Sequence, residues 1–277
     1  SMTAILESGQ YNSNDLINCE NGKYQIIPSK QFQDHEPYGE LSISDIFIYS
    51  SNIGIIKAIE NVGTGHLYEY ARKFGFGIKS GIDLPAETGG ILRPYKEWSR
   101  LSGPSISIGQ EVSANTLQLA LAYSAVANGG YLLSPKIIKS ISGENYLNAN
   151  FQSQPIRKVM SKETSAIILQ MMEDVVNNGT AIKAQIPGFR VGGKTGTAEK
   201  YIDGKYSKEK FISSFAAVFP IDSPKYVCII SVDSPSYGYH WGNETAAPIV
   251  KEIFQRMIIS KHIDLKKGHS LYNYASN

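Results

Sequence analysis

The segment 191–200, VGGKTGTAEK, decides how the rest of the chain is interpreted. Two glycines precede Lys194, and the sequence Thr195-Gly196-Thr197 follows it. Glycines allow another group to approach the backbone closely, while the lysine supplies a cation and the threonines supply hydroxyl groups. These residue types suit the binding of an anion, or of an oxyanion, against an exposed main chain.

One interpretation of this segment is a nucleotide-binding phosphate loop, because residues 188–195, GFRVGGKT, match the pattern G-x-x-x-x-G-K-T. Such a loop needs a buried strand before it and a helix that begins at the lysine and threonine. Pro187 interrupts the preceding segment, and Gly196 disfavours a first helical turn. A chance match is therefore favoured. An exposed lysine in a glycine-rich turn is a further alternative, but it does not explain the β-rich segment that follows.

Composition excludes several classes of function. The chain has 277 residues, 42% hydrophobic and 19% charged, with a formal net charge of +2, which describes an ordinary folded protein. This charge is too small to indicate nucleic-acid binding, and we expect no nucleic-acid partner. Cys19 and Cys228 are the only cysteines and form no C-x-x-C motif, so we expect no metal and no cofactor. They either pair or remain buried thiols, and the second state is the commoner one.

Hydrophobic periodicity predicts helices in the middle of the chain and strands near its end. Ser42 and Asp45 have the spacing of a capping box, and Asn115 is a typical N-cap. Residues 10–40 and 75–107 are expected to be largely irregular, the first with one hairpin. The expected helices are 3–9, 42–50, 52–61, 64–74, 116–128, 161–177 and 247–259. The expected strands are a pair or extended crossing within 131–141 and a hairpin of 211–220 with 226–232. This order indicates an α+β class with an antiparallel sheet.

Several further motifs occur in a fixed order along the chain. They are YSSN at 49–52, FGFG at 74–77, GIDLPAETGG at 81–90, SIGQ at 107–110, ANGG at 127–130, KTGT at 194–197 and AAP at 246–248. Together they resemble the transpeptidase domain of class B penicillin-binding proteins, nearest to the division (septal) type. The resemblance covers about residues 3–259.

The resemblance implies a serine transpeptidase, β-lactamase-like fold: an antiparallel sheet flanked by helices, with a helical subdomain. It implies one partial transpeptidase domain over residues 1–263. The helical subdomain would cover roughly 40–180 and the sheet-forming part mainly 185–263, and 264–277 would be a flexible polar tail. The first strands of the sheet are expected to be missing.

The resemblance also implies roles for two residues of the S-x-N motif, Ser50-Ser51-Asn52. Ser50 would relay a proton to the leaving amine during acyl transfer, and Asn52 would bind the amide of the donor stem peptide. Structural alternatives remain open for both residues, since Ser50 could be a helix C-cap and Asn52 an N-cap of the next helix.

The K-T-G motif would supply the other site residues. Lys194 would hold Ser50 and provide positive potential, and the hydroxyls of Thr195 and Thr197 would contact the substrate carboxylate. The Thr197 N–H would supply half of the oxyanion hole. Gly196 would let the donor peptide lie along the strand edge.

The family's serine nucleophile and lysine base come from an S-x-x-K motif upstream of all these residues. Its only occurrence here is Ser207-Lys208-Glu209-Lys210, which follows K-T-G and is expected to be a solvated loop. We therefore expect the chain to be truncated just after the missing lysine, without its nucleophile. Glu111 and Asn243 stand where glycine is usual, and the first could narrow the rim of a cleft.

The sequence thus predicts part of a peptidoglycan D,D-transpeptidase for septal cell-wall synthesis that cannot be acylated as this fragment. The alternatives are a non-catalytic stem-peptide binding or scaffold module and, third, the nucleotide binder. Expected partners are D-Ala-D-Ala stem peptides, β-lactams and cell-division proteins, including a glycan-polymerising one. The parent chain would be anchored in the bacterial inner membrane with this domain outside the cytoplasm.

Overall fold

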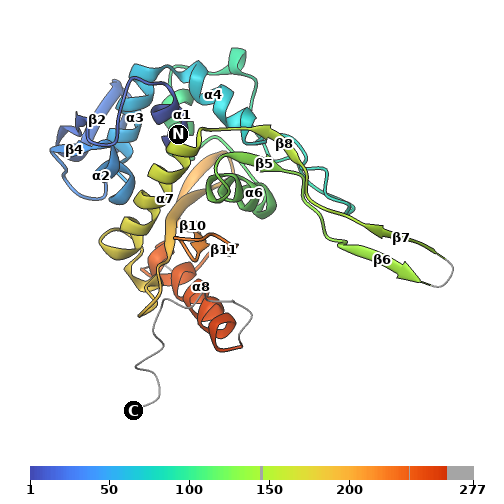
Figure 1. Ribbon diagram of the computed structural model, residues 1–277. Helices are drawn as coiled ribbons and strands as arrows, with labels where there is room; N and C mark the ends of the chain where they lie inside the picture. The colour runs from blue at the N-terminus through green and yellow to red at the C-terminus, as the bar shows by residue number, and fades with distance from the viewer. Residues whose placement is uncertain (144–145, 237, 261–277) are drawn as a thin grey trace. The chain divides into compact units, whose positions relative to one another are not determined.

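The computed structural model describes residues 1–143, 146–236 and 238–260 (Figure 1). The chain divides into two compact units, Ser1–Ile168 and Leu169–Asn277, and the boundary falls inside helix α7 (Lys162–Asn177). Each unit is described by itself. The predicted extent of the transpeptidase domain stays a prediction, and the predicted tail, 264–277, lies outside the described residues.

Helix α3 (Asn52–Val62) is central to the first unit, because it contacts four other helices. These are α1 (Met2–Glu7), α2 (Ile43–Ile48), α4 (Thr64–Lys73) and α5 (Ser102–Ser107). Ile53, Ile56 and Ile59 follow the helical period and are fully buried. Burying each such side chain contributes about 1.5–3 kcal/mol. Packing of these side chains against the neighbouring helices therefore fixes the position of α3, including its N-terminus.

Local capping signals predicted two of the helix starts correctly. The Ser42 Oγ accepts a hydrogen bond from the Asp45 N–H at 3.0 Å at the start of α2. Asn115 and Gln118 form a reciprocal capping box at the start of α6 (Thr116–Ala127). Thr64 is not the cap of α4, because Gly63 holds that position.

The expectation of an irregular segment at 75–107 was wrong at its end, where α5 lies. Its sequence, SGPSIS, contains glycine and proline, which are poor helix formers. All six of its residues are buried, so tertiary packing outweighs their intrinsic preference. A short 3₁₀ turn, η2 (Tyr95–Glu97), also falls in this segment.

Short antiparallel strand pairs complete the first unit. The hairpin expected within 10–40 is formed by β2 (Lys23–Ile27) and β3 (Lys30–Gln33), preceded by the turn η1 (Glu20–Gly22). A second pair was not expected there, β1 (Leu16–Asn18) with β4 (Glu40–Ser42).

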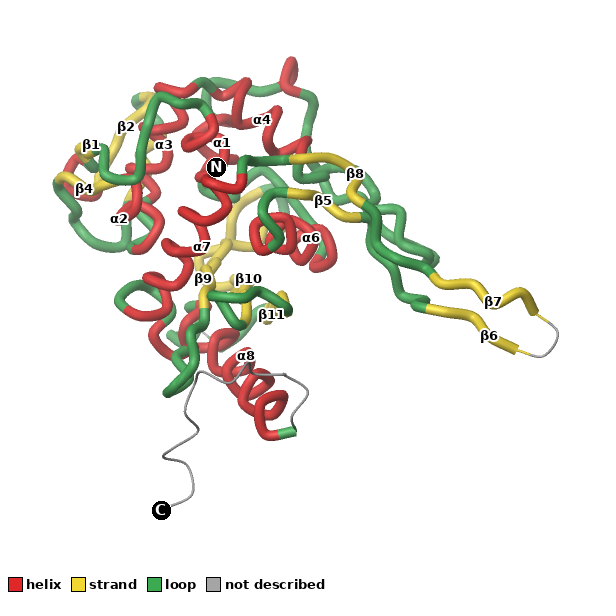
Figure 2. Tube along the Cα trace, in the orientation of Figure 1, coloured by secondary structure: helices red, strands yellow, loops and turns green. Residues whose placement is uncertain are grey.

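Of the two alternatives expected within 131–141, the strand pair was wrong, because the two strands there pair with later segments and not with each other. β5 (Tyr131–Leu133) pairs with β8 (Pro155–Lys158), and β6 (Ser140–Gly143) pairs with β7 (Tyr146–Asn150). Figure 2 shows β6 and β7 at the far end of an extension from this unit.

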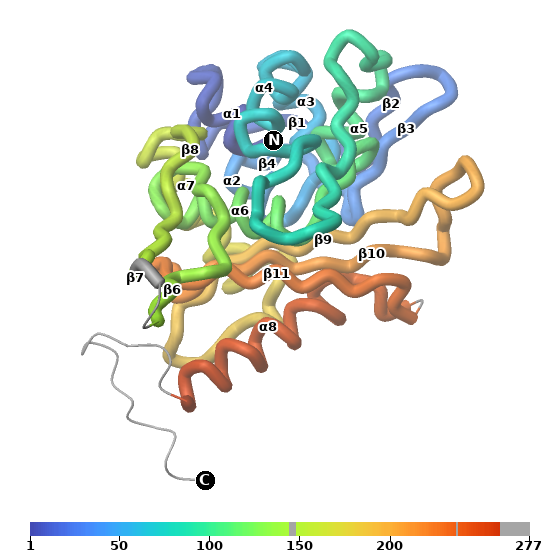
Figure 3. The backbone as a smooth tube through the Cα atoms, turned by 90° about the vertical axis from the view of Figure 1, so that its right-hand side faces the viewer, coloured from blue at the N-terminus to red at the C-terminus, as the bar shows by residue number. Residues whose placement is uncertain are grey.

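The second unit is built on an antiparallel sheet in the order β11-β10-β9. Its strands are β9 (Gly192–Ile202), β10 (Lys205–Phe219) and β11 (Tyr226–Asp233). The predicted hairpin of 211–220 with 226–232 is thereby confirmed. Helix α8 (Gly242–Ile259) lies along the sheet (Figure 3), and a 3₁₀ turn, η3 (Ile182–Ala184), contacts it.

Aromatic stacking joins α8 to β10, since the rings of Phe219 and Phe254 stack with centroids 4.7 Å apart. The predicted start of α8 at Ala247 was wrong by one and a half turns, because the helix begins at Gly242. Proline is common in the first helical turn, but Pro248 lies inside this helix. The early start places the N-terminus of α8 beside the K-T-G strand.

Candidate active site

Ser50 lies directly after α2 in a left-handed backbone conformation, with φ at 60°. The Ser51 N–H donates to the Ile46 carbonyl at 3.0 Å, and the C-cap residue is Tyr49. This is the hydrogen-bond pattern of a Schellman ending, whose left-handed position is usually glycine. A serine there costs about 1–2 kcal/mol. The backbone of Ser50 is therefore strained, and Ser50 is not the C-cap itself. Its side chain is exposed.

Ser51 and Asp34 together cap the N-terminus of α3. The Ser51 Oγ accepts from the Gly54 N–H at 3.0 Å and donates to the Asp34 Oδ2 at 2.6 Å. The Asp34 Oδ1 accepts from the Ile53 N–H at 3.0 Å. Burial raises the pKa of Asp34, and the hydrogen bonds that it accepts oppose this rise. A carboxylate at a helix N-terminus also interacts favourably with the helix dipole.

Asn52 is the first residue of α3 and not its N-cap, which corrects the structural alternative for this residue. Its side-chain Nδ2 donates to the Gln33 carbonyl at 2.8 Å. The end of β3 thus holds both the backbone and the side chain of the S-x-N motif through Gln33 and Asp34. The protein thus holds the Nδ2 group of the Asn52 amide, and the Oδ1 of an amide is an acceptor for a further donor.

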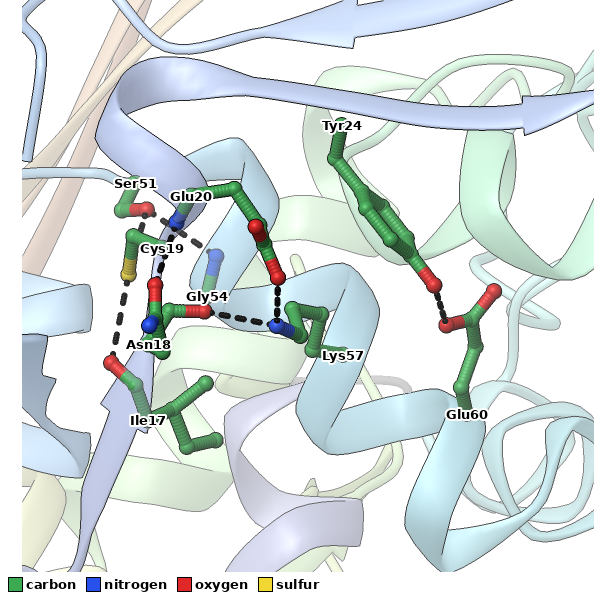
Figure 4. A network of polar contacts seen from close by, with 9 residues as sticks. All are labelled: Ile17, Asn18, Cys19, Glu20, Tyr24, Ser51, Gly54, Lys57 and Glu60. Carbon is green, nitrogen blue, oxygen red and sulfur yellow. Dashed lines mark hydrogen bonds and ion pairs between the residues drawn. The ribbon is translucent and has the colours of Figure 1, made fainter. Parts of the chain in front are cut away.

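A polar network surrounds this motif (Figure 4). The Ser51 Oγ lies 3.5 Å from the Cys19 Sγ, which donates to the Ile17 carbonyl. Lys57, one turn along α3, donates to the Asn18 carbonyl and to the Glu20 carboxylate at 2.7 Å. These contacts tie α3 to the segment of β1 and η1.

Lys194 lies in β9 and is half-buried. Burial lowers the pKa of Lys194 to about 8, because a low-dielectric environment disfavours the ammonium form. Its Nζ donates to the Thr195 carbonyl at 3.2 Å. A lysine with this pKa can exchange a proton near neutral pH.

The two threonine hydroxyls of the motif have different partners. The Thr195 Oγ1 and Thr180 Oγ1 are hydrogen-bonded at 2.9 Å. The Thr197 Oγ1 accepts from the Gly242 N–H at 3.4 Å, at the start of α8. Since that N–H is a donor, the hydroxyl hydrogen of Thr197 remains available for an acceptor such as a carboxylate.

Two glycines of this strand lie close to β10, and at Gly193 close packing requires the glycine. A Cβ on Gly193 would collide with the ring of Phe215, which is fully buried. A Cβ on Gly196 would lie 2.6 Å from the Oγ of Ser214, its partner across the ladder. Lys194 continues into a strand and not into a helix, so the geometry of a phosphate loop is contradicted.

The Ser207–Lys210 segment is part of β10 and not a loop, which corrects the prediction. The register with β9 shifts between Tyr206 and Phe211, so the segment forms an irregularity in the strand. The Ser207 Oγ accepts from the N–H groups of Glu209 and Lys210. The lysine of this S-x-x-K is exposed, as a solvated segment requires.

The two unusual residues, Glu111 and Asn243, both make specific contacts. Glu111 has a φ of 55° and its carboxylate pairs with Arg93 and accepts from the Ser102 Oγ at 3.0 Å. Asn243, in the first turn of α8, accepts from the Lys183 N–H at 3.0 Å. Each side chain therefore joins two segments of its own unit.

Within residues 1–143, 146–236 and 238–260, no group of His, Cys, Asp and Glu is arranged to hold a metal. The same residues include no helix that is both long and apolar enough to cross a membrane. Cys19 and Cys228 are free thiols, the first buried and the second half-buried.

The predicted site residues fall into two groups. Ser50 and Asn52 lie together in the first unit, and the four K-T-G-T residues lie together in the second. The predicted contact of Lys194 with Ser50 stays a prediction. Sequence reasoning missed Asp34 and Thr180, because each touches its motif through long-range contacts that leave no local pattern.

Comparison with known proteins agrees with this geometry. Residues 1–255 match the family model "Penicillin binding protein transpeptidase domain". A peptidoglycan D,D-transpeptidase FtsI homolog of Mesostigma viride is 32% identical over 275 residues, which cover 93% of this chain and 45% of that protein. Stage V sporulation protein D of Bacillus subtilis (strain 168) is 40% identical over 230 residues, covering 82% and 36%. The chain spans less than half the length of these curated relatives.

Solved structures show the same fold. The apo transpeptidase domain of penicillin-binding protein 3 from Burkholderia pseudomallei has a TM-score of 0.83 and 28% identity, covering 95% of this chain and 77% of that one. Penicillin-binding protein 3 from Mycobacterium tuberculosis, complexed with aztreonam, has a TM-score of 0.85 and 28% identity, covering 95% and 61%. The predicted α+β serine transpeptidase fold is confirmed, and the chain belongs to the family of penicillin-binding protein transpeptidase domains.

Proposed function

We propose that this chain carries the S-x-N and K-T-G parts of a peptidoglycan D,D-transpeptidase, which transfers acyl groups from D-Ala-D-Ala stem peptides. The observation that carries the proposal is the position of Lys194 in β9, next to Gly193, which packs against the Phe215 ring. Burial there lowers the pKa of Lys194 to about 8. Family membership supports it.

In this reaction Ser50 relays a proton to the leaving amine, and its exposed position supports that role. Asn52 binds the donor peptide amide through its oriented side chain. Both belong to one rigid capped junction, so the hydroxyl and the amide are presented in a fixed arrangement.

On the other motif, Lys194 provides positive potential and exchanges a proton. The hydroxyls of Thr195 and Thr197 bind the substrate carboxylate, and the Thr197 N–H donates to the oxyanion. Gly196 leaves room for the donor peptide along β9, which is the outer strand of its sheet among the residues described. Main-chain pairing of a peptide with such a strand is β-augmentation.

The nucleophile is not Ser207, because this serine lies in an irregular strand and binds its own backbone. We therefore expect no stable adduct when the chain is incubated with benzylpenicillin and weighed intact by mass spectrometry. An adduct that maps to Ser207 or Ser50 would overturn this assignment.

Substrate recognition is tested by titrating the chain with a diacyl-Lys-D-Ala-D-Ala peptide and with its L-Ala-L-Ala counterpart. We expect binding of the D,D peptide only, and Lys194→Ala should weaken it about tenfold. Lys208→Ala removes the same charge from an exposed position and serves as the matched control. If no binding of the D,D peptide is detected at about 10 mM, its dissociation constant is well above millimolar. That result would count against the proposal.

A stem-peptide binding module without turnover is the second candidate, since the only S-x-x-K here is Ser207–Lys210. A chimera separates the two functions, with the S-x-x-K helix of the Bacillus subtilis relative joined before Thr3. A transpeptidase site predicts acylation by penicillin that Lys194→Ala abolishes, whereas a binding module predicts none.

The biological setting is also part of the proposal. Names of relatives, such as FtsI homolog and penicillin-binding protein 3, support a division role. The aztreonam complex of the Mycobacterium tuberculosis protein supports β-lactam binding. We place the domain outside the cytoplasm of a membrane-anchored parent, where it would work with cell-division proteins, including one that polymerises glycan.

A further inference from the structure

A hollow of about 360 Å³ lies on the first unit, away from both motifs in sequence. It is formed by the end of α4, the loop that follows it and β8. Three cations and one carboxylate are among the residues that line it, which are Tyr68, Glu69, Arg72, Lys73, Ile78 and Arg157. We call this feature the arginine hollow. Its charge is positive.

The charges in the arginine hollow are unequally compensated. Lys73 pairs with Glu69 at 2.7 Å, so these two charges largely cancel. Arg72 donates from Nη1 to the neutral carbonyl of Phe76 at 3.1 Å. The exposed guanidinium of Arg157 makes no hydrogen bond or ion pair with any residue that the structure describes. Two guanidinium groups are therefore left to bind an anion, and their planar donors suit carboxylate or phosphate.

An aromatic surface adjoins the arginine hollow through a shared residue. The rings of Tyr68, Tyr95 and Trp98 pack with centroids 5.3–5.8 Å apart, and we call them the aromatic trio. The two tyrosine rings are tilted to each other, and both meet the Trp98 ring edge to face. Tyr95 is 44% exposed. The Tyr95 hydroxyl is bonded to the Thr64 Oγ1 at 3.1 Å, and the Trp98 indole donates to the Arg93 carbonyl at 3.0 Å. With both polar tips held, the rings are fixed before any ligand arrives.

We propose that the aromatic trio and the arginine hollow form a binding site for an acidic saccharide. The apolar faces of sugar rings pack on Tyr95 and Trp98, while a carboxylate group binds the guanidiniums of Arg72 and Arg157. Binding sites of small ligands combine aromatic walls with a few placed polar groups in this way. A short peptide carboxylate would not need the rings, and a phosphate polymer without sugars would not use their faces.

This site is independent of the transpeptidase motifs, since neither Ser50 nor Lys194 lines it. It would let a cell-wall enzyme hold a glycan while its motifs act on a peptide. Ser50→Ala and Lys194→Ala should therefore leave saccharide binding unchanged, so that failure of one proposal can be told from failure of the other.

The experiment titrates the whole chain by calorimetry with three probes: a glucuronate–N-acetylglucosamine tetrasaccharide, neutral chitotetraose and a glycerol-phosphate oligomer. We expect the acidic tetrasaccharide to bind most tightly. Arg157→Gln should weaken it about tenfold, the effect of one charge-assisted pair, and bring it to the level of chitotetraose. Lys139→Gln is the matched control, because it removes an exposed charge from the same unit and should change nothing.

Tyr95→Leu tests the aromatic trio and should weaken both saccharides by a similar factor without affecting the glycerol-phosphate oligomer. The proposal is overturned if the oligomer binds as tightly as the acidic saccharide, or if Lys139→Gln weakens binding as much as Arg157→Gln. It is also overturned if no saccharide binds at about 5 mM, because a dissociation constant above that concentration is too weak for a specific site. Arg157 is exposed on β8, so Arg157→Gln should fold and keeps the test valid if Tyr95→Leu does not fold.

Discussion

Replacing Asp34 by alanine tests whether this carboxylate holds the S-x-N motif in place. The variant loses the acceptor for the Ser51 hydroxyl at 2.6 Å and for the Ile53 N–H at 3.0 Å. Hydrogen bonds to charged groups contribute about 1.5–3 kcal/mol each. Burial of the charge, which raises the pKa of Asp34, offsets part of this gain. We expect a net loss of about 2 kcal/mol in the free energy of unfolding of the first unit.

The two tryptophans allow each unit to be followed separately, since Trp98 lies in the first and Trp241 in the second. Urea unfolding monitored by Trp98 fluorescence in a Trp241→Phe background therefore reports on the unit that contains Asp34. With a slope of about 2 kcal/mol per molar urea, the midpoint should fall by about 1 M. Glu36→Ala removes an exposed carboxylate nearby and should leave the midpoint unchanged.

A double-mutant cycle decides whether Asp34 acts through Ser51. Two residues in direct hydrogen-bond contact should show a coupling energy of about 1 kcal/mol or more when both are changed to alanine. Strictly additive losses would refute the reasoning, as would a cost for Asp34→Ala below about 0.5 kcal/mol, the level of ordinary surface substitutions.

Three further predictions concern other residues. The pKa of Lys194 is about 8 in the folded chain and 10.5 ordinarily, so between pH 8 and 10.5 the unfolded chain binds more protons than the folded one. The free energy of unfolding, followed by Trp241 fluorescence, should therefore rise from pH 8 to 10.5. Lys194→Met should abolish this rise. Gly193→Ala should cost about 1–3 kcal/mol through overpacking of a buried ring. Gly39→Ala should cost less in a urea titration, because an added Cβ there would meet only the Asn21 Oδ1, at 4.0 Å. Glu111→Ala should be less stable than Glu111→Gly by about 1 kcal/mol, since both lose the ion pair but only alanine keeps the left-handed strain; equal midpoints would show that the strain is absent.

Much of the local structure could be predicted because its causes are local. Ser42 and Asn115 cap their helices through residues three positions away, so the sequence carries the whole signal. The strand alternation of 211–232 similarly predicted the β10–β11 hairpin. Hydrogen bonds within a few residues are what a sequence pattern records.

The rest depends on contacts between distant segments. β5 and β6 pair with β8 and β7, which their own sequences do not indicate. Helix α5 forms from poor helix formers because it is buried. At the candidate site, Asp34 reaches Ser51 across 17 residues and Thr180 reaches Thr195 across 15. Such residues could be identified only once the fold had brought them together.

The backbone conformation at each motif limits which hydroxyl amino acid can stand there, and at Ser50 that conformation is left-handed. A β-branched side chain is strongly disfavoured at positive φ, so threonine cannot replace Ser50 without further strain. Thr195 and Thr197 lie on a strand, where β-branched residues are favoured. We therefore expect serine and threonine to be exchangeable at positions 195 and 197 on β9 but not at position 50, at the α2–α3 junction, although all three positions carry a hydroxyl group.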